Sequence, residues 1–95
     1  MKMNNSQNSY NEIEHLVDCA LDARTKKEAS PYIDRLSFLH RNGGYKGYTN
    51  IVFGELISAV NRAAGAVSDK DRLCGFARTS LFKLQDQMIR DNGEI

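Results

Sequence analysis

The sequence predicts an all-α protein, a small bundle of about four helices whose last two form an antiparallel hairpin. Apolar residues recur every three or four positions through most of the chain, residues typical of helix ends separate four such stretches, and no run alternates as a strand would. Ninety-five residues suffice for one small domain. We expect that domain over residues 9–93, behind a flexible N-terminal tail at residues 1–8.

The first helix is expected to begin at Ser9. Ser9 and Glu12 have the spacing of a capping box, in which each side chain accepts a hydrogen bond from a free backbone N–H. One apolar stripe follows, and acidic residues lie off it; the stripe comprises Tyr10, Ile13, Leu16, Val17, Ala20 and Leu21. Arg24, Lys26 and Lys27 are expected in the last turn, where cations meet the negative end of the helix dipole.

The second helix is expected to be short and to begin at Ser30 and Pro31. Proline suits the first helical position because the N–H it lacks has no partner there. The expected apolar stripe comprises Tyr32, Ile33, Leu36 and Leu39, with Phe38 to one side. The helix is expected to end at Asn42 and Gly43, where a left-handed residue closes it.

The third and fourth helices are expected to form the hairpin. Thr49 or Asn50 would cap the third helix, and Ser68 with Asp71 would cap the fourth after only a tight turn. Small residues let a partner helix approach the third helix closely; they are Gly54, Ala59, Ala63 and Ala66. The expected seam of the fourth helix comprises Cys74, Ala77, Leu81, Leu84 and Met88. Phe76, Phe82 and Ile89 widen its apolar surface beyond one partner helix, which predicts a homo-oligomer.

The composition argues against several classes of protein. Thirteen Lys and Arg against twelve Asp and Glu leave a net charge of +1, which excludes a uniformly basic chain. Apolar runs fall short of the roughly 20 residues of a membrane span, and no signal peptide is recognised, so we expect a cytoplasmic protein. Cys19 and Cys74 are expected as reduced thiols, with a disulfide as the alternative. No metal-ligand spacing occurs, so no metal or cofactor is expected.

The distribution of charge along the chain is more informative than the net charge. Residues 12–22 hold four acidic and no basic residues, whereas residues 24–48 hold six Lys and Arg against two acids, a local sum of +4. The basic segment also contains four of the eight Phe and Tyr residues: Tyr32, Phe38, Tyr45 and Tyr48. Bases stack on aromatic rings and phosphates pair with cations, so this segment predicts a nucleotide or single-stranded nucleic-acid site. The structural alternative is a solvated helix face with tyrosines packed at its rim.

Two other motifs are less specific indications of function than the basic, aromatic segment. The glycine-rich loop at residues 43–50 leads into a helix N-terminus that favours anions, but its spacing is neither that of a dinucleotide-binding turn nor that of a P-loop. A linker is its structural alternative. His15 and Cys19, four residues apart on one helix, form the best nucleophile and base pair in the chain. Nothing obvious supplies an oxyanion hole for them, and we expect no enzymatic activity.

Residues 48–92 resemble the helical hairpin of the anti-CBASS sponge family, phage proteins that sequester cyclic nucleotide immune signals. The likeness rests on Tyr48, an Ala-rich helix, a Ser-led acidic cap and a last helix ending in Ile89, Arg90 and Asn92. The resemblance implies a small, oligomeric, non-enzymatic protein of the host cytoplasm. It also makes Tyr10 with Asn11, and Lys26, candidates for base stacking and phosphate pairing. The chain departs from the family in its predicted helix and glycine loop at residues 31–50, and it lacks the Pro common before the hairpin's Ser.

These observations together predict a non-enzymatic helical binding protein of the phage immune-evasion type, which sequesters a cyclic oligonucleotide signal. The ligand residues expected, from neighbouring subunits, are Tyr10, Asn11, Lys26, Arg41, Tyr45 and Lys46. One alternative is an anti-defence inhibitor or adaptor that binds a host protein through the acidic first helix or the apolar face of the fourth. A nucleic-acid-binding regulator that contacts phosphates through residues 24–48 ranks third.

Overall fold

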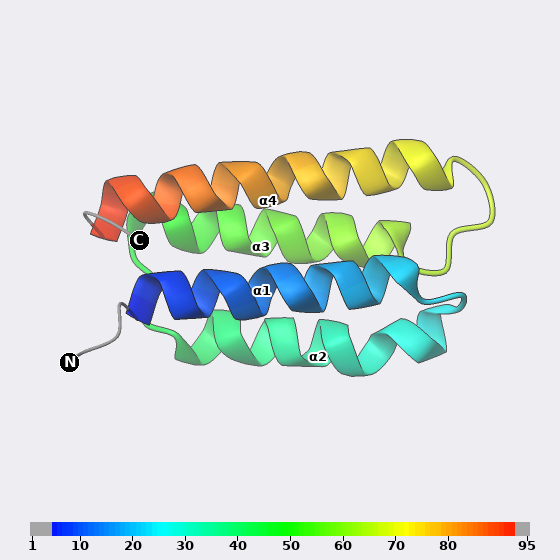
Figure 1. The fold of residues 1–95 in the computed structure, drawn as a ribbon, viewed down its shortest axis with the longest axis horizontal. Helices are drawn as coiled ribbons and strands as arrows, with labels where there is room; N and C mark the ends of the chain where they lie inside the picture. Colours follow the sequence, from blue (N-terminus) through cyan, green and yellow to red (C-terminus); the bar gives the residue numbers. More distant parts are fainter. Residues whose placement is uncertain (1–4, 93–95) are drawn as a thin grey trace.

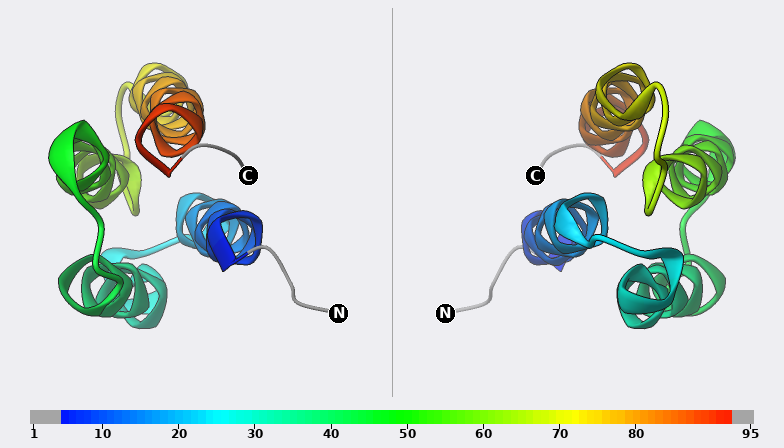
Figure 2. Two further views of the ribbon diagram at one scale, coloured as in Figure 1. Left: turned by 90° about the vertical axis from the view of Figure 1, so that its left-hand side faces the viewer. Right: turned by 90° about the vertical axis from the view of Figure 1, so that its right-hand side faces the viewer.

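The computed structural model describes residues 5–92, which form a bundle of four antiparallel helices (Figure 1). They are α1 (Asn5–Asp22), α2 (Lys26–Asn42), α3 (Gly47–Ala63) and α4 (Lys70–Asn92), and no strand occurs in the described part of the chain. Seen from the ends of the bundle, successive helices lie side by side (Figure 2). The predicted all-α fold and its C-terminal hairpin of α3 and α4 are therefore confirmed.

Helix α1 begins at Asn5, so Ser9 lies inside the helix and the predicted cap at Ser9 is wrong. Nucleating a helix is costly, but adding residues to a helix that is already packed against the core is not. Polar residues before Ser9 can therefore continue α1 towards the N-terminus. Residues 5–8 of the expected tail thus belong to α1, and residues 1–4 lie outside the described residues. The predicted apolar stripe is confirmed, since each of its six side chains is at most 8% exposed.

Helix α2 begins at Lys26, before the predicted boundary at Pro31, and α1 has already ended at Asp22. The hydroxyl of Thr25 accepts a hydrogen bond from the Glu28 N–H at 3.0 Å, and the Glu28 carboxylate accepts one from the Arg24 N–H at 3.0 Å. This reciprocal capping satisfies backbone N–H groups at the start of α2. Pro31 therefore lies inside the helix. Of the basic residues expected to end α1, Lys26 and Lys27 instead begin α2, and Arg24 lies in the connection before it.

Helix α2 ends at Asn42 as predicted, but the expected left-handed residue is Gly44 (φ +71°) rather than Gly43 (φ −83°). A Cβ at Gly43 would collide with the Tyr45 ring and lie 2.7 Å from the Leu39 carbonyl oxygen. The glycine is therefore needed there because Tyr45 folds back over the helix end.

Helix α3 begins at Gly47, so the predicted cap at Thr49 or Asn50 is wrong. The backbone N–H of Thr49 donates to Oδ2 of Asp91 at 2.9 Å, and the Thr49 hydroxyl donates to the same oxygen at 2.8 Å. Asp91 lies near the end of α4, so the acceptor for this helix start comes from 42 residues further along the chain. The two bonds from Thr49 lower the pKa of the Asp91 carboxyl.

The connection between α3 and α4 covers residues 64–69 rather than a tight turn. Val67 lies in this loop and is fully exposed. Asp69, with φ +58°, and not Ser68, precedes the first residue of α4, so the predicted capping box is wrong. The carbonyl of Asp69 accepts the first bond, from the Leu73 N–H at 2.9 Å.

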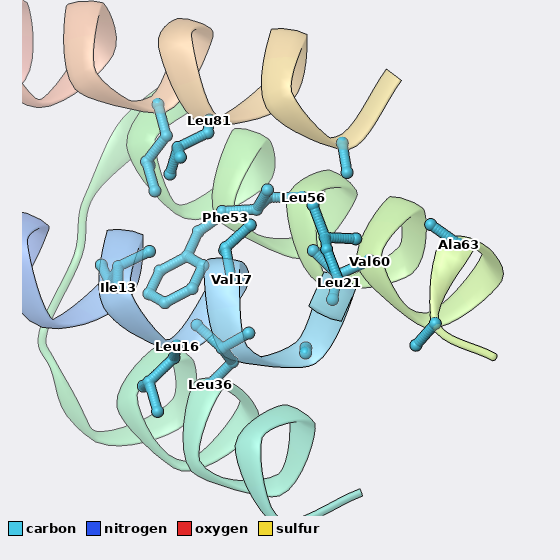
Figure 3. Packing of buried hydrophobic residues seen from close by; sticks show 14 of the residues in the cluster. Ile13, Leu16, Val17, Leu21, Leu36, Phe53, Leu56, Val60, Ala63 and Leu81 are labelled. Atoms are coloured by element: carbon cyan, nitrogen blue, oxygen red, sulfur yellow. The ribbon is translucent and has the colours of Figure 1, made fainter. Parts of the chain in front are cut away.

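The core draws on all four helices, with Phe53 of α3 near its centre beside Val17 and Leu36 (Figure 3). In the predicted seam of α4, Cys74 is half-buried and the other four residues are buried. Both cysteines are free thiols. Within the described residues, no helix has the length and apolar character needed to cross a membrane.

Candidate functional site

Three of the predicted ligand residues, Arg41, Tyr45 and Lys46, lie at the end of the bundle where α2 passes into α3. The Tyr45 ring packs edge-on against the buried Phe53 ring, with centroids 5.1 Å apart. The His40 ring lies 5.2 Å from the same Phe53 ring. Tyr45 therefore covers the core at this end of the bundle, while Arg41 and Lys46 are exposed.

Lys26 stands at the opposite end of the bundle. It is separated from Arg41 by 15 residues of α2, about 22 Å at 1.5 Å per residue. Its ammonium group donates to the backbone carbonyl of Asn61 and to the Asn61 side-chain oxygen, 3.3 Å away for the latter. Lys26 thus compensates the negative end of α3, a structural role for a residue that the resemblance connects with phosphate.

Tyr10 and Asn11 lie on the first half of α1. Tyr10 is 5% exposed and belongs to the core, so little of its ring surface is open for stacking. Burial, followed by the nearby carboxylates of Glu14 and Asp18, raises the pKa of the Tyr10 hydroxyl. Asn11 is exposed. A single chain therefore gathers Arg41, Tyr45 and Lys46, but it places Lys26 far from them.

The positive charge of residues 24–48 is spread along α2 rather than gathered in one patch. Nε of Arg35 donates to a Glu12 carboxylate oxygen at 3.0 Å, and its guanidinium carbon lies 5.1 Å from the centroid of the Phe38 ring. Two of the six cations, Arg35 and Lys26, thus have partners within the chain.

A groove of about 350 Å³ between α3 and α4 combines cations with an aromatic ring. Its lining from α3 is Glu55, Ser58, Ala59 and Arg62, and from α4 it is Arg72, Leu73 and Phe76. Residues equally far from the turn of an antiparallel hairpin face each other, and Arg62 and Arg72 are each five residues from Val67. That symmetry is the signal that could have revealed the groove, but sequence reasoning centred on residues 24–48 missed it.

The groove offers hydrogen-bond donors and an open aromatic surface. The guanidinium carbon of Arg72 lies 5.8 Å from the Phe76 ring centroid, and its Nη2 donates to Asp69 at 2.9 Å. None of the side chains that the structure describes forms a salt bridge with Arg62. Phe76 is 56% exposed. An anion held between the two arginines would therefore have a stacking surface beside it.

A second pocket of about 460 Å³ lies between α1 and α2 and is lined by Cys19, Asp22, Ala23, Glu28 and Tyr32. His15 and Cys19, which the sequence pairs on one face of α1, are in contact: Sγ of Cys19 lies 3.6 Å from Nε2 of His15. The two carboxylates of this pocket oppose binding of an anion. In the part of the chain that the structure describes, no three His, Cys, Asp or Glu side chains gather closely enough to hold a metal ion.

Comparison with known proteins gives no significant match to any protein-family model, curated protein or solved structure.

Proposed function

We propose that this chain is a non-enzymatic binding protein of the phage immune-evasion type, which sequesters a cyclic oligonucleotide in the groove between α3 and α4. The observation that carries the proposal is the pair Arg62 and Arg72 beside the exposed Phe76 ring. A nucleotide requires this combination, since its phosphate pairs with guanidinium groups and its base stacks on an aromatic face.

The remaining lining residues suit the polar edge of a nucleotide. Ser58 can donate and accept hydrogen bonds, and Glu55 can accept them from base amino groups or ribose hydroxyls. The volume of about 350 Å³ lies at the lower end of the range for small-molecule pockets. A cyclic di- or trinucleotide would therefore place one of its units in the groove and leave the others to solvent or to a neighbouring subunit.

Calorimetric titration with a panel of cyclic di- and trinucleotides tests the proposal. Wild-type protein is expected to release heat with at least one member of the panel, and Arg62→Ala together with Arg72→Ala should abolish it. Arg24→Ala is the matched control, because it removes an exposed arginine that neither lines the groove nor belongs to the ligand residues predicted from the sequence. Absence of heat across the whole panel would reject the proposal.

The same titration decides between the groove and the residues predicted from the sequence. If Lys26→Ala and Arg41→Ala abolish the heat while the groove variant binds normally, the ligand contacts residues around α2 instead. Tyr10→Ala is unsuitable for this purpose because the ring is buried, and its removal would destabilise the fold.

An inhibitor or adaptor that binds a host protein is the second candidate. The acidic face of α1 favours it: Glu14 is exposed, and the Asp18 side chain is 49% exposed although it pairs with Arg78. Recovery of one stoichiometric partner from bacterial lysate at high salt, with no heat in the nucleotide titration, would favour this function over ligand binding.

A further inference from the structure

One side of α4 is apolar and little covered. Phe82 is 70% exposed and Ile89 is 44% exposed, seven residues apart and therefore on the same face of the helix. Arg78, four residues before Phe82, reaches Asp18 of α1 at 2.8 Å, which places this face on the α1 side of α4. The two side chains remain exposed because α4 packs mainly against α3, and α1 packs mainly against α2.

The charges beside these apolar residues are also exposed. Asp86 is 62% exposed, and its Oδ2 accepts a hydrogen bond from Nε of Arg90 at 3.0 Å. Lys83 is exposed and forms no salt bridge with the side chains that the structure describes. Asp86 retains a second oxygen, Oδ1, for another cation.

This face is complementary to itself about a two-fold axis beside Gln85. Phe82 lies three residues before Gln85 and Ile89 four after it, while Lys83 lies two before and Asp86 one after. If two α4 helices pair antiparallel about Gln85, Phe82 lies opposite the partner's Ile89, and Lys83 lies opposite the partner's Asp86. Each pair is out of exact register by one residue, about 1.5 Å along the helix axis. Two apolar contacts and two ion pairs would then form together, as expected of an interface that uses the same patch on both subunits.

We infer that α4 mediates dimerisation of this chain, with Phe82 packed on the partner's Ile89 and Lys83 paired with the partner's Asp86. A second copy suits this face better than a basic helix of another protein, because Lys83 and Arg90 would repel added cations. The inference concerns a face other than the α3–α4 groove, so it does not rest on the proposed function.

Sedimentation equilibrium of the full chain tests the dimer. Phe82→Ser is expected to raise its dissociation constant about 100-fold, because each dimer loses two buried phenyl rings. Phe76→Ser is the matched control, since it removes another exposed phenylalanine of the same helix but lies in the α3–α4 groove. Circular dichroism of each variant establishes that the helices are intact.

Charge exchange tests the pairing itself. Lys83→Asp and Asp86→Lys should each weaken the dimer, because each places like charges opposite each other, and the double variant should restore it. A monomer at all accessible concentrations, or a dimer insensitive to Phe82→Ser and to both charge reversals, would overturn the inference. So would a monomer that binds an acidic amphipathic peptide in a Phe82-dependent manner, since this face would then serve a different partner.

Discussion

Replacement of Gly65 by alanine tests how the α3–α4 loop rests on the start of α2. Gly65 has φ +74°, and a Cβ there would lie 2.5 Å from the Lys26 backbone nitrogen and 2.9 Å from the Thr25 carbonyl carbon. The left-handed conformation costs a residue with a Cβ about 1–2 kcal/mol, and forcing an atom into packed backbone costs about 1–3 kcal/mol. We expect Gly65→Ala to lower the free energy of unfolding by about 2–5 kcal/mol, as measured by urea denaturation.

Two other glycines separate these contributions. Gly44 has φ +71° but open space around its Cβ position, so Gly44→Ala should cost only the conformational part, about 1–2 kcal/mol. Gly75 lies within α4 with neither restriction, and Gly75→Ala should stabilise the protein by about 0.5–1 kcal/mol. If Gly65→Ala proved as stable as Gly44→Ala, the close approach of the loop to α2 would be refuted.

Three shorter tests concern the core and the start of α3. Phe53→Leu removes the ring contacts of Tyr45 and His40 and should cost about 1–3 kcal/mol, and less in a Tyr45→Leu background, as a denaturant double-mutant cycle would reveal. Thr49→Val should cost about 1–2 kcal/mol in the same denaturation assay, because it removes a buried hydroxyl whose one hydrogen is shared between Oδ2 of Asp91 and the Gln87 carbonyl. Asp91 has a folded pKa below its ordinary value of 3.8, so its ionised form stabilises the fold above that pH and the stabilisation is lost as pH falls through the folded pKa. Thermal melts should therefore find Asp91→Asn less stable than wild type near neutral pH, with the difference shrinking below pH 3.8; a difference independent of pH would contradict this assignment.

The buried side of each helix could be read from the sequence, whereas the helix starts could not. Burial follows a repeat of three and four residues that is local, so the stripe from Tyr10 to Leu21 was predicted correctly. The predicted start of α2 was wrong because the sequence holds two helix-start signals close together. The helix begins at the cap formed by Thr25 and Glu28 and not at Pro31. The start of α3 was beyond local reasoning, since its acceptor is the side chain of Asp91.

The groove between α3 and α4, like the helix starts, could not be predicted from local sequence. Sequence reasoning concentrated on the charge of residues 24–48, but charges near in sequence are distributed over the length of α2 when that segment is helical. Arg62 and Arg72 belong to different helices and meet because the hairpin turns between them. Their shared groove therefore depends on the pairing of α3 with α4.

The repeat of apolar residues is enough to predict a small helical bundle, the residues that face its core and an apolar surface on α4 larger than the core uses. The helix starts and the side chains that share a surface follow from tertiary packing, including the Arg62 and Arg72 groove and the open face with Phe82 and Ile89. Helical periodicity and apolar burial are encoded over a few residues, whereas caps such as Asp91 and grooves between helices join residues that only folding brings together.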